Sequence, residues 1–174
     1  MNAKRLVTNA VFIALMVLLK YVAIDIPTLS IKASLAYFPI IVCALLFGYA
    51  DGMIVGGLGE FIFQFLRYGL GPTTALWLVA PIASGLIVGL YAQKKGFELT
   101  MRQTAGIVLA SCLAVTAINT VGLYFDAQIL AYPTALTFVN IVLRFASSVV
   151  MTIVYTLMCP QAVELIRKSG VARN

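Results

Sequence analysis

Long apolar stretches separated by short polar breaks are the feature that most constrains how this chain can fold. A helix of roughly 20 apolar residues crosses the hydrocarbon core of a bilayer, which is about 30 Å thick. Six such stretches cover residues 6–24, 35–49, 53–70, 74–92, 104–125 and 135–158. We therefore predict an all-α membrane protein, a bundle of six transmembrane helices that forms a single domain over residues 1–174.

The composition supports lipid as the solvent for most of the chain. Of the 174 residues, 62% are hydrophobic and 10% are charged, and the mean hydropathy is +1.03. Ordinary soluble domains carry roughly 25% charged residues, and a soluble fold of this length could not bury so much apolar surface. Six spans also leave no room for an ATPase domain, so energy for any transport must come from a gradient or from partner chains.

The positions of the lysines and arginines predict the orientation, because such residues concentrate in cytoplasmic loops. Basic residues lie near the N-terminus, between the fourth and fifth stretches, and in the C-terminal tail; these are Lys4, Arg5, Lys94, Lys95, Arg102, Arg167, Lys168 and Arg173. Both termini are therefore predicted to be cytoplasmic. The net charge of +6 is then explained by basic residues on the cytoplasmic side of the membrane, and no nucleic-acid partner is expected.

The residue types argue against an enzyme and against a metal site. The chain has no histidine, which removes the commonest general base and a common metal ligand. No phosphate-binding loop sequence occurs. Cys43, Cys112 and Cys159 are widely spaced within apolar stretches and are interpreted as buried apolar residues. No cofactor is predicted for this chain.

Ionisable residues inside apolar stretches are costly and usually face a cavity or a partner charge. Glu60, Gln64 and Arg67 follow one another at spacings of four and three, so a helix would place them on one face. Arg144 lies within the sixth stretch. One interpretation is a substrate site; the alternative is a structural salt bridge between Glu60 and one of the arginines.

Aromatic residues gather near the predicted external ends of the helices. Tyr37 and Tyr68 belong to this group, and Trp77 follows a turn at 71–74 that includes Thr74. An interfacial belt explains many such residues, but aromatic walls with a few polar groups also suit a planar ligand. The connections at 25–34, 68–73 and 126–134 are predicted as external loops, which either cover a binding site or merely link helices.

Small residues recur at helical spacing, which allows helices to approach closely in lipid. Gly48, Gly52 and Gly56 form one such series, and Gly85 and Gly89 form another. On the first predicted span, Ala10 and Ala14 form a further pair.

Together, six short spans and the Ala10–Ala14 motif resemble the substrate-binding (S) component of an energy-coupling factor (ECF) vitamin transporter. The resemblance covers the whole chain. It implies that Ala10 and Ala14 dock on a transmembrane coupling subunit, which works with two ATPase subunits that use ATP. It also implies a multi-pass protein of a bacterial cell membrane that binds a water-soluble vitamin from outside.

The folate-type branch of that family is the most similar. The segments 38–40, 47–48 and 52–60 resemble its second and third helices, with Glu60 where the branch usually has an aspartate. In a folate carrier, Lys32, Arg67 or Arg144 would meet the carboxylates of the vitamin. Cobalamin is the other candidate vitamin, for which Asn119, Asn140 and Gln128 would supply amide contacts. A stand-alone secondary carrier or channel is the alternative of a different class.

Overall fold

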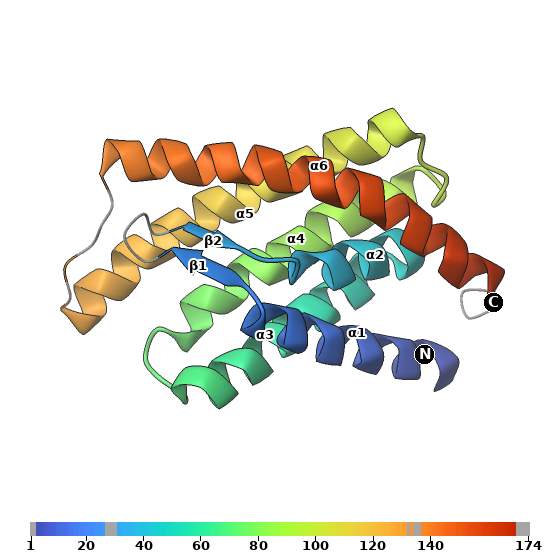
Figure 1. Ribbon diagram of the computed structural model, residues 1–174. Helices are drawn as coiled ribbons and strands as arrows, with labels where there is room; N and C mark the ends of the chain where they lie inside the picture. Colours follow the sequence, from blue (N-terminus) through green and yellow to red (C-terminus); the bar gives the residue numbers. More distant parts are fainter. Residues whose placement is uncertain (1–2, 27–30, 132, 134–136, 170–174) are drawn as a thin grey trace.

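The computed structural model describes residues 3–26, 31–131, 133 and 137–169. Six helices and one short hairpin make up this part of the chain (Figure 1). The elements are α1 (Ala3–Tyr21), β1 (Ile24–Ile26), β2 (Ile31–Ala33), α2 (Tyr37–Phe47), α3 (Tyr49–Tyr68), α4 (Thr74–Lys94), α5 (Met101–Leu130) and α6 (Phe138–Lys168). The predicted bundle of six helices is confirmed.

The lengths and compositions of the helices directly support a membrane location for only part of the bundle. By length and composition, α4, α5 and α6 can each cross a bilayer, whereas α2 is a shorter apolar helix of 11 residues. A membrane-spanning role for α1, α2 and α3 stays a prediction, as does the cytoplasmic location of the termini. The start of α1 and the end of α6 do lie at the same end of the molecule (Figure 1).

The short helix α2 forms the centre of the core. Its residues 39–46 are all buried, and it contacts α1, α3, α4 and α6. A helix enclosed by other helices must be apolar on every side, and this run meets that requirement. The longer helices surround it, with exposed apolar side chains on their outer faces, such as Val7, Val149 and Ile153. Those faces suit contact with lipid.

The turn between α2 and α3 lies at Gly48, not at 50–52 where the sequence analysis placed the break between its second and third spans. Gly48 has φ of 94°, a conformation that side chains rarely adopt, and its N–H donates to the Ala44 carbonyl at 3.0 Å. Residues 50–52 instead form the first turn of α3. The break requires only one residue because glycine supplies the positive φ.

The glycine series predicted for close helix contact does bring α3 against α4. A Cβ added to Gly85 would lie 2.2 Å from the Gly52 carbonyl carbon, and one added to Gly56 would lie 2.5 Å from the Pro81 carbonyl oxygen. The two backbones therefore touch along this seam. Such contact gives van der Waals packing where lipid supplies no hydrophobic driving force.

Two predicted external connections differ from simple loops. In the segment 25–34, β1 and β2 pair antiparallel, with Asp25 opposite Lys32, so the all-α bundle carries one small hairpin that the sequence analysis did not predict. Helix α5 continues to Leu130 and α6 to Lys168, well beyond the predicted spans that end at 125 and 158. Asp126, predicted in a loop, is therefore a helical residue.

Candidate binding site

A cavity of about 710 Å³ opens among the helix ends that lie opposite the chain termini, and we call it the outer cavity. It is bounded by the end of α1, the segment before α2, the outer halves of α3 and α5, the start of α4 and the first turns of α6. Its described lining residues include Lys20, Ser34, Tyr37, Glu60, Phe63, Gln64, Tyr68, Thr74, Trp77, Asn119, Asp126 and Arg144. A volume of this size is typical of small-molecule sites.

The structure brings most of the predicted site residues to this cavity. Those that line it are Tyr37, Glu60, Gln64, Tyr68, Thr74, Trp77, Asn119 and Arg144. Arg67 is instead exposed, with its guanidinium carbon 6.0 Å from the centre of the Tyr21 ring. Asn140 is buried but is not among the described lining residues. Lys32 lies in β2, and its side chain is outside the described part of the structure.

Glu60 forms an ion pair with Lys20 at the wall of the outer cavity. Gln64 supports the pair, because its Nε2 donates to Glu60 Oε1 at 3.0 Å. The sequence analysis offered an arginine as the structural partner of Glu60; the described partner is a lysine from the end of α1. Lys20 was not among the residues predicted for the site. The signal that could have found it is the rule that a carboxylate inside a span needs a cation.

Aromatic rings and a second acid, Asp126, also line the outer cavity. The indole Nε1 of Trp77 donates to Asp126 Oδ1 at 3.4 Å, which links the start of α4 to α5. Phe63 contacts the Tyr21 and Tyr68 rings edge to face, with ring centres 5.3 and 6.1 Å apart. The cavity thus combines flat apolar walls with a few fixed polar groups, which is the composition of a site for a planar ligand.

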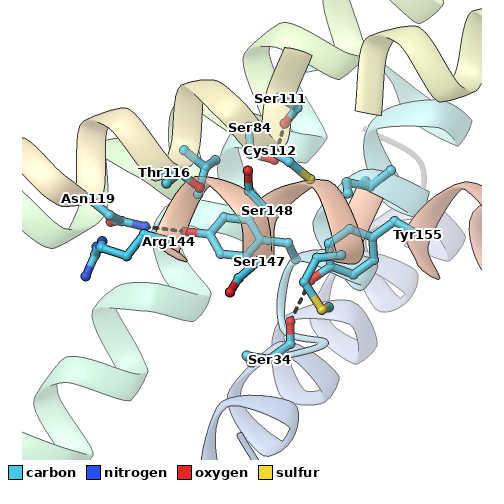
Figure 2. A pocket seen from close by; sticks show the side chains of 14 residues that line it. Ser34, Ser84, Ser111, Cys112, Thr116, Asn119, Arg144, Ser147, Ser148 and Tyr155 are labelled. Atoms are coloured by element: carbon cyan, nitrogen blue, oxygen red, sulfur yellow. Dashed lines mark hydrogen bonds between the residues drawn. The ribbon is translucent and has the colours of Figure 1, made fainter. Parts of the chain in front are cut away.

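A smaller space of about 160 Å³, the inner chamber, adjoins the outer cavity. Figure 2 shows the side chains that line this chamber. The two spaces share four lining residues, Ser34, Tyr37, Asn119 and Arg144. Asn119 Nδ2 donates to the Tyr37 hydroxyl at 3.3 Å, and Arg144 Nε donates to Thr120 Oγ1 at 3.2 Å. These side chains mark the junction between the two spaces.

The sequence analysis missed the other polar residues of the inner chamber. They are Ser84, Ser111, Thr116, Ser147, Ser148 and Tyr155. A usable signal was the spacing on the last helix, since Ser147 and Ser148 follow Arg144 by three and four residues and so share its face. The serines of α4 and α5 carried no comparable signal.

Comparison with known proteins identifies the family. The sequence model described as "ECF-type riboflavin transporter, S component" matches residues 1–164. The chain belongs to this family. It is therefore a component of a transporter and not an enzyme, as the sequence analysis predicted. No curated protein matches the chain.

A solved structure, described as "Structure and mechanism of the S component of a bacterial ECF transporter", is also similar to this S component. It matches with a TM-score of 0.65 and 15% sequence identity, over 98% of each chain. At this identity the likeness concerns the fold. The resemblance to ECF S components is thus confirmed, whereas the folate-type branch is not supported, since the matching family is of the riboflavin type.

The two alanines of the family resemblance lie on an outer face of α1 in this S component. Ala10 and Ala14 are both exposed, whereas Asn9, Phe12 and Met16 face the core. The neighbouring side chains of Val7 and Leu18 are 63% and 62% exposed, so the alanines form a shallow strip between larger apolar residues. The predicted docking role of this strip stays a proposal.

Proposed function

We propose that this S component binds riboflavin in the outer cavity and inner chamber and passes it inward with a coupling subunit and two ATPase subunits. The observation that carries the proposal is the match of the riboflavin-type family over residues 1–164. The described residues form no energy-converting domain, which agrees with energy conversion by separate ATPase subunits.

The charges of the outer cavity support an uncharged vitamin. The described charged residues that line it are two basic ones, Lys20 and Arg144, and two acidic ones, Glu60 and Asp126. The ion pair of Lys20 with Glu60 neutralises one of each. A folate carries two carboxylates and would add two negative charges to a lining whose described charges already balance. Riboflavin is neutral and needs no such compensation.

The walls of the site also suit the shape of a flavin. The isoalloxazine ring is planar and can lie against flat aromatic side chains, which Trp77, Tyr68 and Phe63 provide. The hydroxyls of the ribityl chain can exchange hydrogen bonds with amide and carboxylate groups, of which Gln64 and Glu60 are examples. Burial of a planar apolar ring beside a few fixed polar groups is the usual composition of a small-molecule site.

Uptake into liposomes tests the complete proposal. Vesicles that contain the chain together with an ECF coupling subunit and ATPases should accumulate labelled riboflavin when ATP is supplied. Vesicles with the chain alone should not accumulate it, with or without an ion gradient. Gradient-driven uptake by the chain alone would instead favour the stand-alone carrier, and ATP-driven uptake of folate or cobalamin but not riboflavin would contradict the proposed substrate.

A further inference from the structure

The first two turns of α1 are held to the bundle by polar side chains. Within residues 3–10 the buried residue is Asn9. The apolar side chains of this segment point outward, since Leu6 and Val7 are 55% and 63% exposed. Apolar burial therefore contributes little to fixing this end of α1, and hydrogen bonds and charge must fix it instead.

Asp51, in the first turn of α3, accepts these polar contacts. Its side chain is 2% exposed and forms an ion pair with Arg5, whose Nε donates to Asp51 Oδ1 at 2.9 Å. Asn9 Nδ2 donates to the same oxygen at 2.6 Å. Because Arg5 and Asn9 are four residues apart on one face of α1, a single buried acid fixes two successive turns of the helix.

The same side chains tie α1 to the end of α2. Arg5 Nη2 donates to the Phe47 carbonyl at 2.9 Å, and the guanidinium carbon lies 5.4 Å from the centre of the Phe47 ring. One turn earlier on α2, Cys43 Sγ donates to Asn9 Oδ1 at 3.4 Å. Cys43 is fully buried, and Asn9 is among the groups that cover its thiol.

The strip of Ala10 and Ala14 lies on the other side of these turns. Both alanines are exposed whereas Asn9 is buried. Successive residues of a helix are about 100° apart around its axis, which places the alanines roughly opposite Arg5 and Asn9. The contacts with Asp51 therefore leave the strip uncovered and fix the direction in which it points.

Resting on the proposed function, we infer that Asp51 is a positioning residue for assembly of the transporter. Acting through Arg5 and Asn9, it holds the strip where a coupling subunit can dock. Without the carboxylate, Arg5 turns to water, because its side chain is already 37% exposed, and Asn9 loses an acceptor. The first turns of α1 then leave their place on α2 and α3, and the docking position becomes a minority state.

Asp51→Ala in the complete chain tests this role. Co-purification with a coupling subunit and its ATPases should weaken by about tenfold, the loss expected when roughly a tenth of the molecules keep the docking position. Riboflavin affinity should be unchanged, because the outer cavity lies at the other end of α1. Asp51→Asn keeps an oxygen that accepts from Asn9, so it should retain part of the co-purification, and it serves as the milder variant should Asp51→Ala not fold.

Cys43 reports directly on the position of α1. In the wild-type chain N-ethylmaleimide should label Cys43 slowly, because its thiol is buried. Asp51→Ala should speed the labelling of Cys43, followed by mass spectrometry of the peptides. Cys112 and Cys159 are also buried and lie on α5 and α6, so they should stay protected. Faster labelling of all three cysteines would mean general unfolding and would overturn the inference.

Two controls separate position from stability. Thr8→Ala changes the same turn of α1, where Thr8 Oγ1 donates to the Lys4 carbonyl of its own helix, and should alter neither co-purification nor labelling of Cys43. Val108→Ala truncates a fully buried side chain on α5. It should lower the unfolding midpoint and leave co-purification intact.

The outcomes distinguish this inference from the proposed function. Equal loss of co-purification in Asp51→Ala and Val108→Ala would assign the effect to stability and overturn the inference. Retained co-purification in Asp51→Ala, or unchanged labelling of Cys43, would also overturn it. A wild-type chain that fails to co-purify with a coupling subunit would instead contradict the proposed function itself.

Discussion

At the scale of single residues, loss of one partner from the ion pair of Glu60 with Lys20 is expected to cost the most stability. The Glu60 side chain is 2% exposed and that of Lys20 is 14% exposed. Removing one partner of a buried pair leaves an uncompensated charge, which costs far more than the pair contributes when intact. The pair thus joins α1 to α3 beside the binding cavity.

Lys20→Met should lower the free energy of unfolding by about 3 kcal/mol, because it leaves Glu60 buried without its cation. The double variant Lys20→Met with Glu60→Gln should recover much of that loss. Thermal unfolding in detergent measures both. The matched control is Glu164→Gln, which breaks the exposed pair with Lys168 and should leave the unfolding midpoint unchanged. A Lys20→Met chain as stable as the wild type would show that water or another group already compensates Glu60.

Whether a site residue could be predicted from the sequence depended on how costly it is to bury that side chain in an apolar stretch. Glu60 and Arg144 were identified because a charge within an apolar stretch demands an explanation. Trp77 was identified from its place beside a turn. Lys20 was missed because it lies forty positions from Glu60, and only the fold brings them together. The chamber serines were missed because a hydroxyl bonded to its own helix gives no periodic signal.

At the scale of helices, the α3–α4 seam depends on glycine. A Cβ at Gly85 would meet the backbone of Gly52, so the helices could not keep their separation.

The helix content of the chain could be predicted from its apolar runs, but the positions of the helix ends could not. The break at Gly48 needed only one residue of positive φ, whereas the sequence analysis placed it at the more polar residues 50–52. Hydropathy also gave no sign of the hairpin, because its strands are three residues each.

Gly85→Ala should destabilise the protein by about 2 kcal/mol, the usual cost of overpacking a close contact. Gly106→Ala is the matched control, since a Cβ there meets no atom within 4 Å and alanine favours a helix over glycine. The unfolding midpoint should fall for the first variant and stay or rise for the second. Equal midpoints would mean that α3 and α4 are not in backbone contact.

At the scale of the whole molecule, two surfaces have separate tasks under the proposed function. The vitamin site lies at one end of the bundle, and the strip of Ala10 and Ala14 lies on the outer face of α1 toward the other end. Because the strip is exposed and the site is internal, substitutions can test them independently.

Replacing Ala10 and Ala14 together with tryptophan should abolish co-purification with the coupling subunit and leave flavin affinity unchanged, because bulky rings prevent close helix contact. Val150→Trp, on an exposed position of α6, should affect neither property. Retained co-purification of the alanine variant would place the docking surface elsewhere.

The central claim is that this chain alone forms a specific riboflavin site, and an equilibrium titration tests it most directly. The purified chain in detergent is titrated with riboflavin, with flavin fluorescence as the readout, and with folate in parallel. We predict saturable binding of one riboflavin per chain with a Kd below about 1 µM, equivalent to roughly −8 kcal/mol, and no saturable binding of folate. A well-folded sample that binds folate but not riboflavin, or neither vitamin, would contradict the account.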